Sequence, residues 1–310
     1  MKPYSADVIA PSTGEFKRQV SSFRNWIKKD SQHPPEADRY HLYVSYACPW
    51  AHRTLIGLAL KGLQHIISVS VVHHFLGPDG WSFATPEECP GAIPDPLYNS
   101  KFLRELYLKA DPEYKARVTV PLLWDKKLHT AVNNESSEIL RMLNSEFNEF
   151  AKNPTLDLYP EALRAQIDEL NTWVYDGFNN GVYKSGFATK QEAYENNVKV
   201  VFETMDKMEA ILAKHPYFVG DVFTEADVRA FTTAVRFDPV YVVHFKCNLK
   251  QIGSSYPHLL KWMRKIYQIP GVAETVNMEH IKKHYFISHI SINPNQIVGW
   301  SNGPDLTLKD

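Results

Sequence analysis

The pattern of apolar and polar positions changes near the middle of the chain. In the first half, short runs rich in β-branched and aromatic residues occur at 41–46, 66–75, 118–125 and 127–133. Such runs are typical of strands. From residue 159 onward, strand patterns nearly vanish, and long amphipathic segments such as 160–178 and 192–215 take over. The pattern predicts an α/β domain followed by an all-α domain.

The order of elements in the first half is informative. A helical pattern over 51–62 follows the first predicted strand and stops at Gly62, and the segment 76–98 is broken by Gly and Pro into a long loop. A capped helix is expected over 135–147. The resulting order, β–α–β, loop and helix, then β–β–α, is that of thioredoxin-like domains, in which Pro121 would suit a cis proline facing the active cysteine.

These patterns divide the chain into four parts. The N-terminal part is irregular, apart from an amphipathic stretch near Phe23, Trp26 and Ile27 that favours a short helix. The predicted boundaries are 1–38 for this N-terminal extension, 39–152 for the thioredoxin-like domain, 159–290 for the helical domain and 291–310 for a C-terminal tail. Within the helical domain, Thr224 and Asp227 have the spacing of a structural capping box.

Composition limits the function classes. The 310 residues include 34 Lys and Arg against 35 Asp and Glu, with no dense basic run, which disfavours nucleic-acid binding. Neither a signal peptide nor a membrane-spanning run is present, so we expect a cytoplasmic protein without membrane contact. The three cysteines, an odd number without metal-like spacing, favour reduced thiols.

Cys48 is the residue whose sequence context best fits a catalytic nucleophile. It lies where a strand ends and a helix begins, with Pro49 in the first helical position. The helix dipole and free amides there favour a thiolate and should lower the thiol pKa below about 8.5. The position three residues on is Ala51, so no resolving thiol shares the turn. A mixed disulfide then needs an outside thiol, and glutathione is the abundant one in a reducing compartment.

The remaining candidates are weaker. We expect Cys89 and Cys247 to be buried packing residues. His280 and His284 have helical i, i+4 spacing, but no third ligand is suggested and Lys282 and Lys283 would repel a cation, so we predict no metal site. No nucleotide-binding glycine motif occurs.

The chain also resembles a known family. A thioredoxin-like half, a helical half, Cys48-Pro49-Trp50-Ala51, Val120-Pro121 and Glu135-Ser136 resemble the cytosolic glutathione transferases of cysteine type. Longer strings resemble the xi class, the glutathionyl-hydroquinone reductases, and together span most of residues 12–295: YACPWAHRTLI, DPLYNSKFLRELYLKADP, RVTVPLLWDK, NNESSEILRM, NNGVYKSGFAT, TEADVRAFTTAVRFDPVYVVHFKCN and PGVAETVNMEHIKKHYF.

The resemblance implies a glutathione transferase fold and a glutathione site. In that site Glu135 and Ser136 would hold the γ-glutamyl end, and the Val120 backbone would pair with the cysteinyl amide. Trp81 and the run Arg117, Val118 and Thr119 would enclose the rest. A helix N-terminus offers amides for a carboxylate, and a glutamate can meet an ammonium, so the residue chemistry agrees.

The resemblance also implies the reaction. Tyr183 would give or take a proton, with Tyr241 and Tyr285 placed to lower the Cys48 pKa. The implied function is reductive removal of glutathione from glutathionyl-hydroquinones through a Cys48 mixed disulfide, in a homodimer acting on small molecules with glutathione as co-substrate and no metal or nucleotide. Two alternatives stay open, an omega-like thiol transferase or dehydroascorbate reductase and a non-catalytic scaffold.

Overall fold

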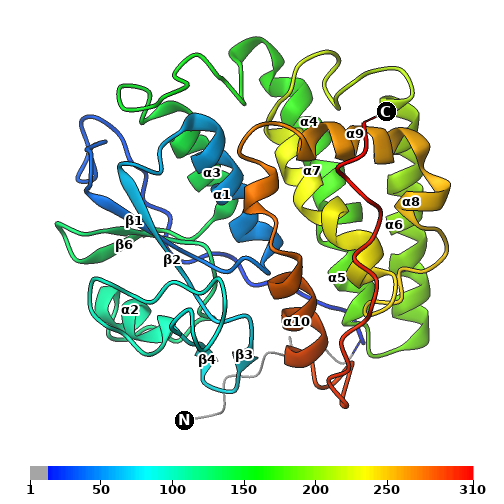
Figure 1. The fold of residues 1–310 in the computed structure, drawn as a ribbon, viewed down its shortest axis with the longest axis horizontal. Coiled ribbons are helices and arrows are strands. Elements are labelled where there is room, and N and C mark those ends of the chain that lie inside the picture. The colour runs from blue at the N-terminus through cyan, green and yellow to red at the C-terminus, as the bar shows by residue number, and fades with distance from the viewer. Residues whose placement is uncertain (1–12, 310) are drawn as a thin grey trace. The chain divides into compact units, whose positions relative to one another are not determined.

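The computed structural model describes residues 13–309, which form two compact units. Unit 1 contains Gln19–Asp157 and Glu274–His284, and unit 2 contains residues 13–18, Leu158–Ala273 and 285–309. The sequence-based division differs from this one in where residues 19–38, 274–284 and 291–309 belong, because the first two ranges lie in unit 1 and the last lies in unit 2. The predicted α/β part followed by an all-α part is confirmed, as Figure 1 shows.

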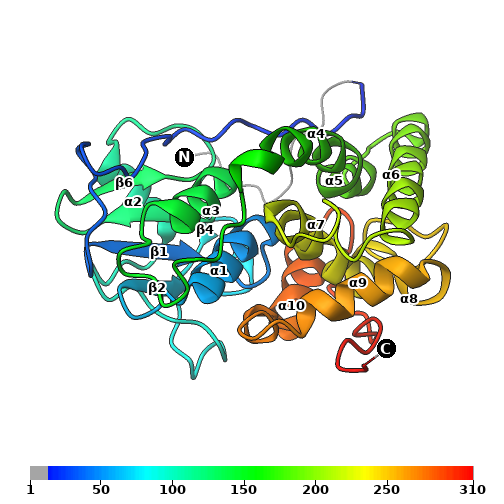
Figure 2. The ribbon, with the colours of Figure 1, turned by 90° about the horizontal axis from the view of Figure 1, so that it is seen from above.

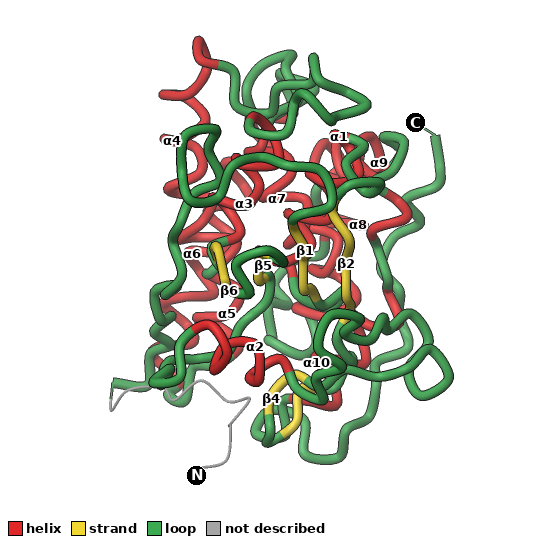
Figure 3. The backbone as a smooth tube through the Cα atoms, turned by 90° about the vertical axis from the view of Figure 1, so that its left-hand side faces the viewer, coloured by secondary structure: helices red, strands yellow, loops and turns green. Residues whose placement is uncertain are grey.

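Unit 1 is built on a four-stranded sheet in the order β2-β1-β5-β6 (Figure 3). The strands are β1 (Tyr40–Val44), β2 (Ile67–Val71), β5 (Leu122–Asp125) and β6 (Thr130–Asn133). β1 runs parallel to β2 and antiparallel to β5, and β5 and β6 form the predicted hairpin. Every residue of β1 is buried, as expected for a central strand.

The helices of unit 1 follow the predicted order. They are α1 (Pro49–Lys61), α2 (Leu103–Ala110) and α3 (Ser136–Ser145). Helix α1 ends as predicted at Gly62, whose φ of 65° is the left-handed conformation that glycine adopts most readily. Helices α1 and α3 pack against each other beside the sheet (Figure 2), and their apolar faces join one core with the strands.

Two expectations for irregular parts of unit 1 need correction. The loop 76–98 is largely irregular but contains a small hairpin, β3 (Leu76–Gly77) with β4 (Gly80–Trp81). The helix expected near Phe23 is absent. Instead, Arg24 bridges to Asn133 and the Asn25 N–H donates to the Val132 carbonyl at 3.0 Å, so this segment runs along the edge of β6. Its backbone groups pair with a strand edge rather than within a helical turn, while the Ile27 side chain is fully buried. The part of the N-terminal extension before residue 13 lies outside the described residues.

Among its described residues, the regular secondary structure of unit 2 is helical, apart from an isolated bridge between Val219 and Val222. Its main helices are α4 (Arg164–Val174), α5 (Gly181–Gly186), α6 (Gln191–Leu212), α7 (Glu225–Arg236), α8 (Ile252–Ser255) and α9 (Pro257–Tyr267). Two π-helical turns interrupt the pattern, η2 (Tyr175–Asn179) before α5 and η3 (Phe237–Tyr241) after α7. Short 3-10 turns occur at Glu161–Leu163 and Ala273–Thr275, and α10 (Met278–Ser288) passes from unit 1 to unit 2 after His284. Within residues 13–309, no helix has the length and apolar character needed to cross a bilayer.

The predicted capping box at the start of α7 is confirmed. The Thr224 hydroxyl accepts the Ala226 N–H at 3.3 Å, and the Asp227 carboxylate accepts the Thr224 N–H at 3.0 Å. Asp227 also accepts hydrogen bonds from the Phe218 N–H and the Trp262 indole. One buried carboxylate therefore ties α7 to α9 and to the preceding loop.

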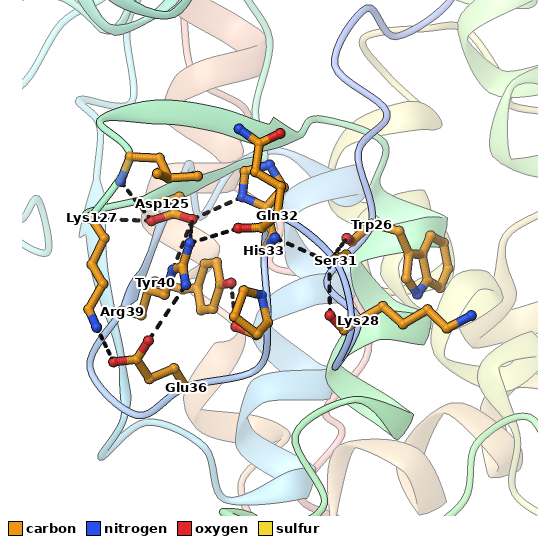
Figure 4. A network of polar contacts seen from close by, with 12 residues as sticks. Trp26, Lys28, Ser31, Gln32, His33, Glu36, Arg39, Tyr40, Asp125 and Lys127 are labelled. Atoms are coloured by element: carbon orange, nitrogen blue, oxygen red, sulfur yellow. Dashed lines mark hydrogen bonds and ion pairs between the residues drawn. The ribbon is translucent and has the colours of Figure 1, made fainter.

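A buried ion-pair network lies at the edge of the sheet in unit 1 where β1 begins and β5 ends (Figure 4). One Asp125 carboxylate oxygen receives hydrogen bonds from the Arg39 guanidinium at 2.6 and 3.0 Å and lies 2.9 Å from His33 Nδ1. The other accepts the backbone N–H groups of Lys127 and Leu128. Burial alone would raise the Asp125 pKa, but hydrogen bonds from Arg39 and His33 outweigh it and lower the pKa. The network joins the N-terminal segment, β1 and the β5–β6 turn.

Replacing Asp125 with Asn should destabilise the fold by about 3 kcal/mol or more, because the buried Arg39 guanidinium would lose its nearer counter-charge and keep only Glu36, which lies 3.6 Å away. Chemical unfolding monitored by circular dichroism would measure this. The matched control is Glu113→Gln, which removes the carboxylate of an exposed pair with Lys115 and should leave stability unchanged. Equal stabilities of the two variants would show that the network contributes little.

Candidate active site

Cys48 occupies the N-cap position of α1, as the sequence predicts. Its backbone is extended, and its sulfur accepts the Ala51 N–H at 3.5 Å. The same sulfur lies 3.5 Å from the Val120 carbonyl, to which the thiol form can donate. The Val120–Pro121 peptide bond is cis, which confirms the sequence-based expectation. The side chain is half-buried, so the thiol is held in place yet remains partly accessible.

Glu135 caps α3 in unit 1. One carboxylate oxygen accepts the Ser137 N–H at 3.1 Å and the Ser137 hydroxyl at 2.9 Å, and the other accepts the Ser21 hydroxyl at 3.0 Å. Burial would raise the Glu135 pKa, but the hydrogen bonds from Ser137 and the charge of Arg53 together lower it. Glu135 therefore presents a fixed negative charge at the beginning of the helix.

Arg53 supports the same corner from α1. Its guanidinium reaches the Ser136 hydroxyl at 3.4 Å and lies over the Trp50 ring, 4.5 Å from the ring centroid. Arg53 and Ser136 are both almost fully buried. A buried cation beside Glu135 balances its charge, and stacking on an aromatic face is a favoured arrangement for a guanidinium. Arg53 thus orients the group that begins α3.

The run from Arg117 to Val120 leads into the cis proline. The backbone of Arg117 is held at both ends: its N–H donates to the Gln19 side chain at 3.2 Å, and its carbonyl accepts the Tyr114 hydroxyl at 2.8 Å. The Thr119 carbonyl accepts the Tyr107 hydroxyl at 2.7 Å, and Val118 is buried. The half-buried Arg117 guanidinium makes no hydrogen bond or ion pair with any described residue. It is therefore a cation that could receive an acidic ligand.

Trp81 lies in the small hairpin of the long loop. Its ring is buried and stacks on His284 of α10, with centroids 5.0 Å apart. The two histidines that share one helix face in the sequence analysis, His280 and His284, have different partners. His280 Nε2 lies 2.7 Å from the Pro90 carbonyl. His284 instead lies 3.0 Å from the His74 carbonyl through Nδ1. The two histidines therefore bind separate backbone groups of the loop region.

Three tyrosines form a chain of hydroxyls in unit 2. The Tyr285 hydroxyl lies 2.5 Å from that of Tyr183 and 2.9 Å from that of Tyr241. Tyr183 comes from α5, Tyr241 ends the π-helical turn η3, and Tyr285 belongs to α10. Tyr241 and Tyr285 are buried, whereas Tyr183 is half-buried and forms the accessible end of the chain.

The buried members of this chain hold their protons. Burial raises the pKa of Tyr241 and of Tyr285 well above the ordinary value, because a phenolate there would lose its hydration. Both are neutral hydroxyls at physiological pH and can donate hydrogen bonds. Tyr285 can therefore donate to Tyr183 and support negative charge on its oxygen.

The structure adds residues that sequence reasoning missed. The Arg18 guanidinium lies over the Tyr183 ring, 5.1 Å from its centroid, and its Nε donates to the Asn180 side chain at 3.0 Å. Ser21 reaches Glu135, and Arg53 reaches Ser136. No local signal could identify Arg18 or Ser21, because they belong to a segment without periodicity. All the predicted glutathione residues and Cys48 lie in unit 1, and the three tyrosines and Arg18 lie in unit 2.

Comparison with known proteins places this geometry in a family. Residues 47–146 match the family described as "Glutathione S-transferase, N-terminal domain", and residues 191–265 match "Glutathione S-transferase, C-terminal domain". A solved structure described as the glutathione S-transferase Xi from Phanerochaete chrysosporium is 56% identical, with a TM-score of 0.91, and the match covers 92% of this chain and 97% of that one. The chain belongs to the xi class of the glutathione transferases.

Two other relatives of this xi-class transferase carry informative names. A Schizosaccharomyces pombe protein named "Glutathione S-transferase omega-like 2" is 56% identical, and the match covers 91% of each chain. The Escherichia coli protein named "Glutathionyl-hydroquinone reductase YqjG" is 54% identical over 94% of this chain and 90% of its own. A solved structure of YqjG is described as glutathione-bound and has a TM-score of 0.87, with 92% of this chain and 94% of that one covered.

Proposed function

We propose that this chain is a glutathione-dependent reductase that removes the glutathionyl group from glutathionyl-hydroquinones. The observation that carries the proposal is the Cys48 sulfur at the N-cap of α1, with Ala51 in the position where a dithiol enzyme has its second cysteine. A single thiol at a helix N-terminus favours thiolate and leaves an external thiol to resolve the disulfide. The name of the E. coli relative supports the substrate class.

The first half-reaction breaks a carbon–sulfur bond. The Cys48 thiolate attacks the glutathionyl sulfur, and a disulfide forms between Cys48 and glutathione. The electron pair of the broken bond goes to the ring carbon, which takes up one proton to give the free hydroquinone. The substrate ring is thereby reduced, while the two sulfurs are oxidised to a disulfide.

The second half-reaction restores the enzyme. A glutathione thiolate attacks the glutathione sulfur of the mixed disulfide, oxidised glutathione leaves, and Cys48 returns as thiolate. Product departs before the second glutathione reacts, so the kinetics should be ping-pong. Because Ala51 cannot supply a thiol, each turnover consumes a second glutathione molecule.

Glutathione binding is assigned to the polar groups of unit 1. Glu135 supplies a negative charge for the γ-glutamyl ammonium, while Ser136 and the N-terminus of α3 face its carboxylate. The Val120 backbone pairs with the cysteinyl amide, which would occupy the carbonyl that otherwise accepts from the Cys48 thiol. Arg117 offers a charge for an acidic end, and Trp81, Val118 and Thr119 enclose the rest.

Proton transfer is assigned to the tyrosines of unit 2. Tyr183 delivers the proton to the ring carbon, since it is the half-buried end of the hydroxyl chain. Tyr285 and Tyr241 stay protonated and stabilise negative charge by donating hydrogen bonds, first on Tyr183 and, as the resemblance implies, on the Cys48 thiolate. Arg18 lies over the Tyr183 ring and also favours negative charge there.

The proposal includes the setting of the enzyme. A cytoplasmic location fits three free cysteines and a glutathione-dependent reaction. A homodimer is proposed by resemblance to the family. The S. pombe relative's name favours an omega-like thiol transferase as a second candidate, one that uses the same Cys48 but needs no proton at carbon.

Replacing Cys48 with Ser should abolish turnover of a glutathionyl-hydroquinone, by roughly a thousandfold or more, because the hydroxyl cannot form the mixed disulfide. Steady-state assays of hydroquinone release would measure this. The matched control is Cys247→Ser, since burial raises the Cys247 pKa to about 12 and that thiol stays inert. Normal turnover by Cys48→Ser would exclude the mechanism.

Replacing Tyr183 with Phe should separate the two candidate functions. The change keeps the ring but removes the hydroxyl, so the rate on a glutathionyl-hydroquinone should fall by about two to four powers of ten. The rate on a small glutathione mixed disulfide should be nearly unchanged, because disulfide exchange needs no proton at carbon. Equal losses on both substrates would mean that Tyr183 only shapes the pocket or tunes Cys48. Unchanged rates on both would favour the omega-like function.

A further inference from the structure

A cluster of histidines surrounds Cys89 in unit 1, outside the proposed active site. The Cys89 sulfur is fully buried and lies 3.1 Å from His74 Nδ1 and 3.7 Å from His280 Nε2. One ligand atom from each of His73, His74 and Cys89 can be chosen such that all three lie within 4.8 Å of one another. Sequence spacing pointed only to His280 and His284 as a possible metal pair, whereas the fold brings donors together from the segment after β2, the long loop and α10.

The spacing of these donors matches a zinc site. Zinc bonds of about 2.3 Å to sulfur and 2.0–2.1 Å to nitrogen place neighbouring donors of a tetrahedron about 3.5 Å apart. The distance from His74 Nδ1 to Cys89 Sγ, 3.1 Å, is close to that value, and the ligand atoms of His73, His74 and Cys89 all lie within 4.8 Å of one another. A thiolate with imidazoles is also the donor set that zinc prefers among common ions. A single ion could therefore bind with small movements of the side chains.

The backbone holds the cluster together without a metal. The Cys89 N–H donates to the Thr85 carbonyl at 2.9 Å, which closes the turn that presents the sulfur. Gly91 follows with a φ of +90°, and a Cβ there would lie 3.1 Å from His280 Nε2. A glycine thus permits both the turn and its close approach to α10. The positions of the donors are set by the fold rather than by chance exposure.

We propose that Cys89, His74 and His73 bind a zinc ion, with the fourth position open to a solvent molecule. Cys89 loses its proton to solvent and binds as thiolate. His280 supports it from α10, because its Nε2–H donates to the Pro90 carbonyl at 2.7 Å and also faces the sulfur. A hydrogen bond of this kind stabilises a thiolate ligand and orients it.

Two features of the site oppose binding of a zinc ion, but each is offset by another interaction. His73 Nδ1 accepts the Phe75 N–H at 2.9 Å, so coordination of that ring costs one neutral hydrogen bond, which a metal–nitrogen bond replaces. Lys283 carries a positive charge on the same helix as His280, but its ammonium pairs with Glu279 at 2.6 Å. The ion would join the segment after β2 to the loop that carries Trp81.

Cobalt titration of the full-length Cys48→Ser protein tests the site, because that background removes the reactive, partly accessible thiol. We expect one equivalent of Co²⁺ to bind with a thiolate-to-cobalt charge-transfer band, and Zn²⁺ to displace it. Adding Cys89→Ser should remove the band, whereas adding Cys247→Ser, the matched buried thiol, should retain it. His74→Gln should weaken binding at least about tenfold.

The outcomes separate the site from folding effects. Circular dichroism checks each variant, and if Cys89→Ser fails to fold, the affinity of His74→Gln decides the question. Absence of a thiolate band in the Cys48→Ser background overturns the proposal, as does a band that survives Cys89→Ser. An unchanged affinity in folded His74→Gln also overturns it. None of these readouts depends on the reductase activity.

Discussion

The turn between β1 and α1 places a sulfur where helices usually have an oxygen cap, and the chemistry proposed for unit 1 depends on that contact. Ser, Thr, Asp and Asn are the preferred N-caps, and Cys48 takes their place with the Ala51 N–H as donor. The buried β1, paired on both sides, fixes the direction in which the chain enters the helix. A weaker cap is thus held in place by the sheet, and the helix N-terminus acts on a thiol that can react.

The polar groups near this cap are arranged before any ligand binds. Glu135 already receives hydrogen bonds from Ser137 and Ser21, and Arg53 is fixed between Trp50 and Ser136. In unit 2, burial keeps Tyr241 and Tyr285 protonated, which leaves Tyr183 as the accessible hydroxyl. Preorganised donors of this kind stabilise charge without rearrangement during the reaction. Unit 1 thus carries the fixed charges of Glu135 and Arg53, and unit 2 carries the neutral hydroxyls of Tyr241 and Tyr285.

Sequence periodicity was sufficient for the elements whose patterns are local. The strand–helix junction at Cys48, the stop at Gly62 and the capping box at Thr224 follow from short-range rules, and the structure agrees with all three. The prediction of a helix near Phe23 was wrong, because the apolar spacing there also suits a strand edge. Only tertiary pairing with β6 decides between a helix and an edge segment. Arg18 could not be predicted, since its contact with Asn180 joins residues 162 positions apart. The cluster around Cys89 depends on how the long loop folds, because His74 lies 15 positions before Cys89 and His280 lies 191 positions after it. The three tyrosines were predicted from the family resemblance and not from their spacing in the sequence.

The central claim is that Cys48 alone accepts the glutathionyl group, and a single-turnover experiment tests it most directly. The wild-type protein is mixed with a stoichiometric amount of a glutathionyl-hydroquinone in the absence of free glutathione, and hydroquinone release and intact mass are followed together. We expect one equivalent of hydroquinone and one reducible glutathione adduct, mapped to Cys48. Hydroquinone release without an adduct, or an adduct on Cys89 or Cys247, would contradict the account.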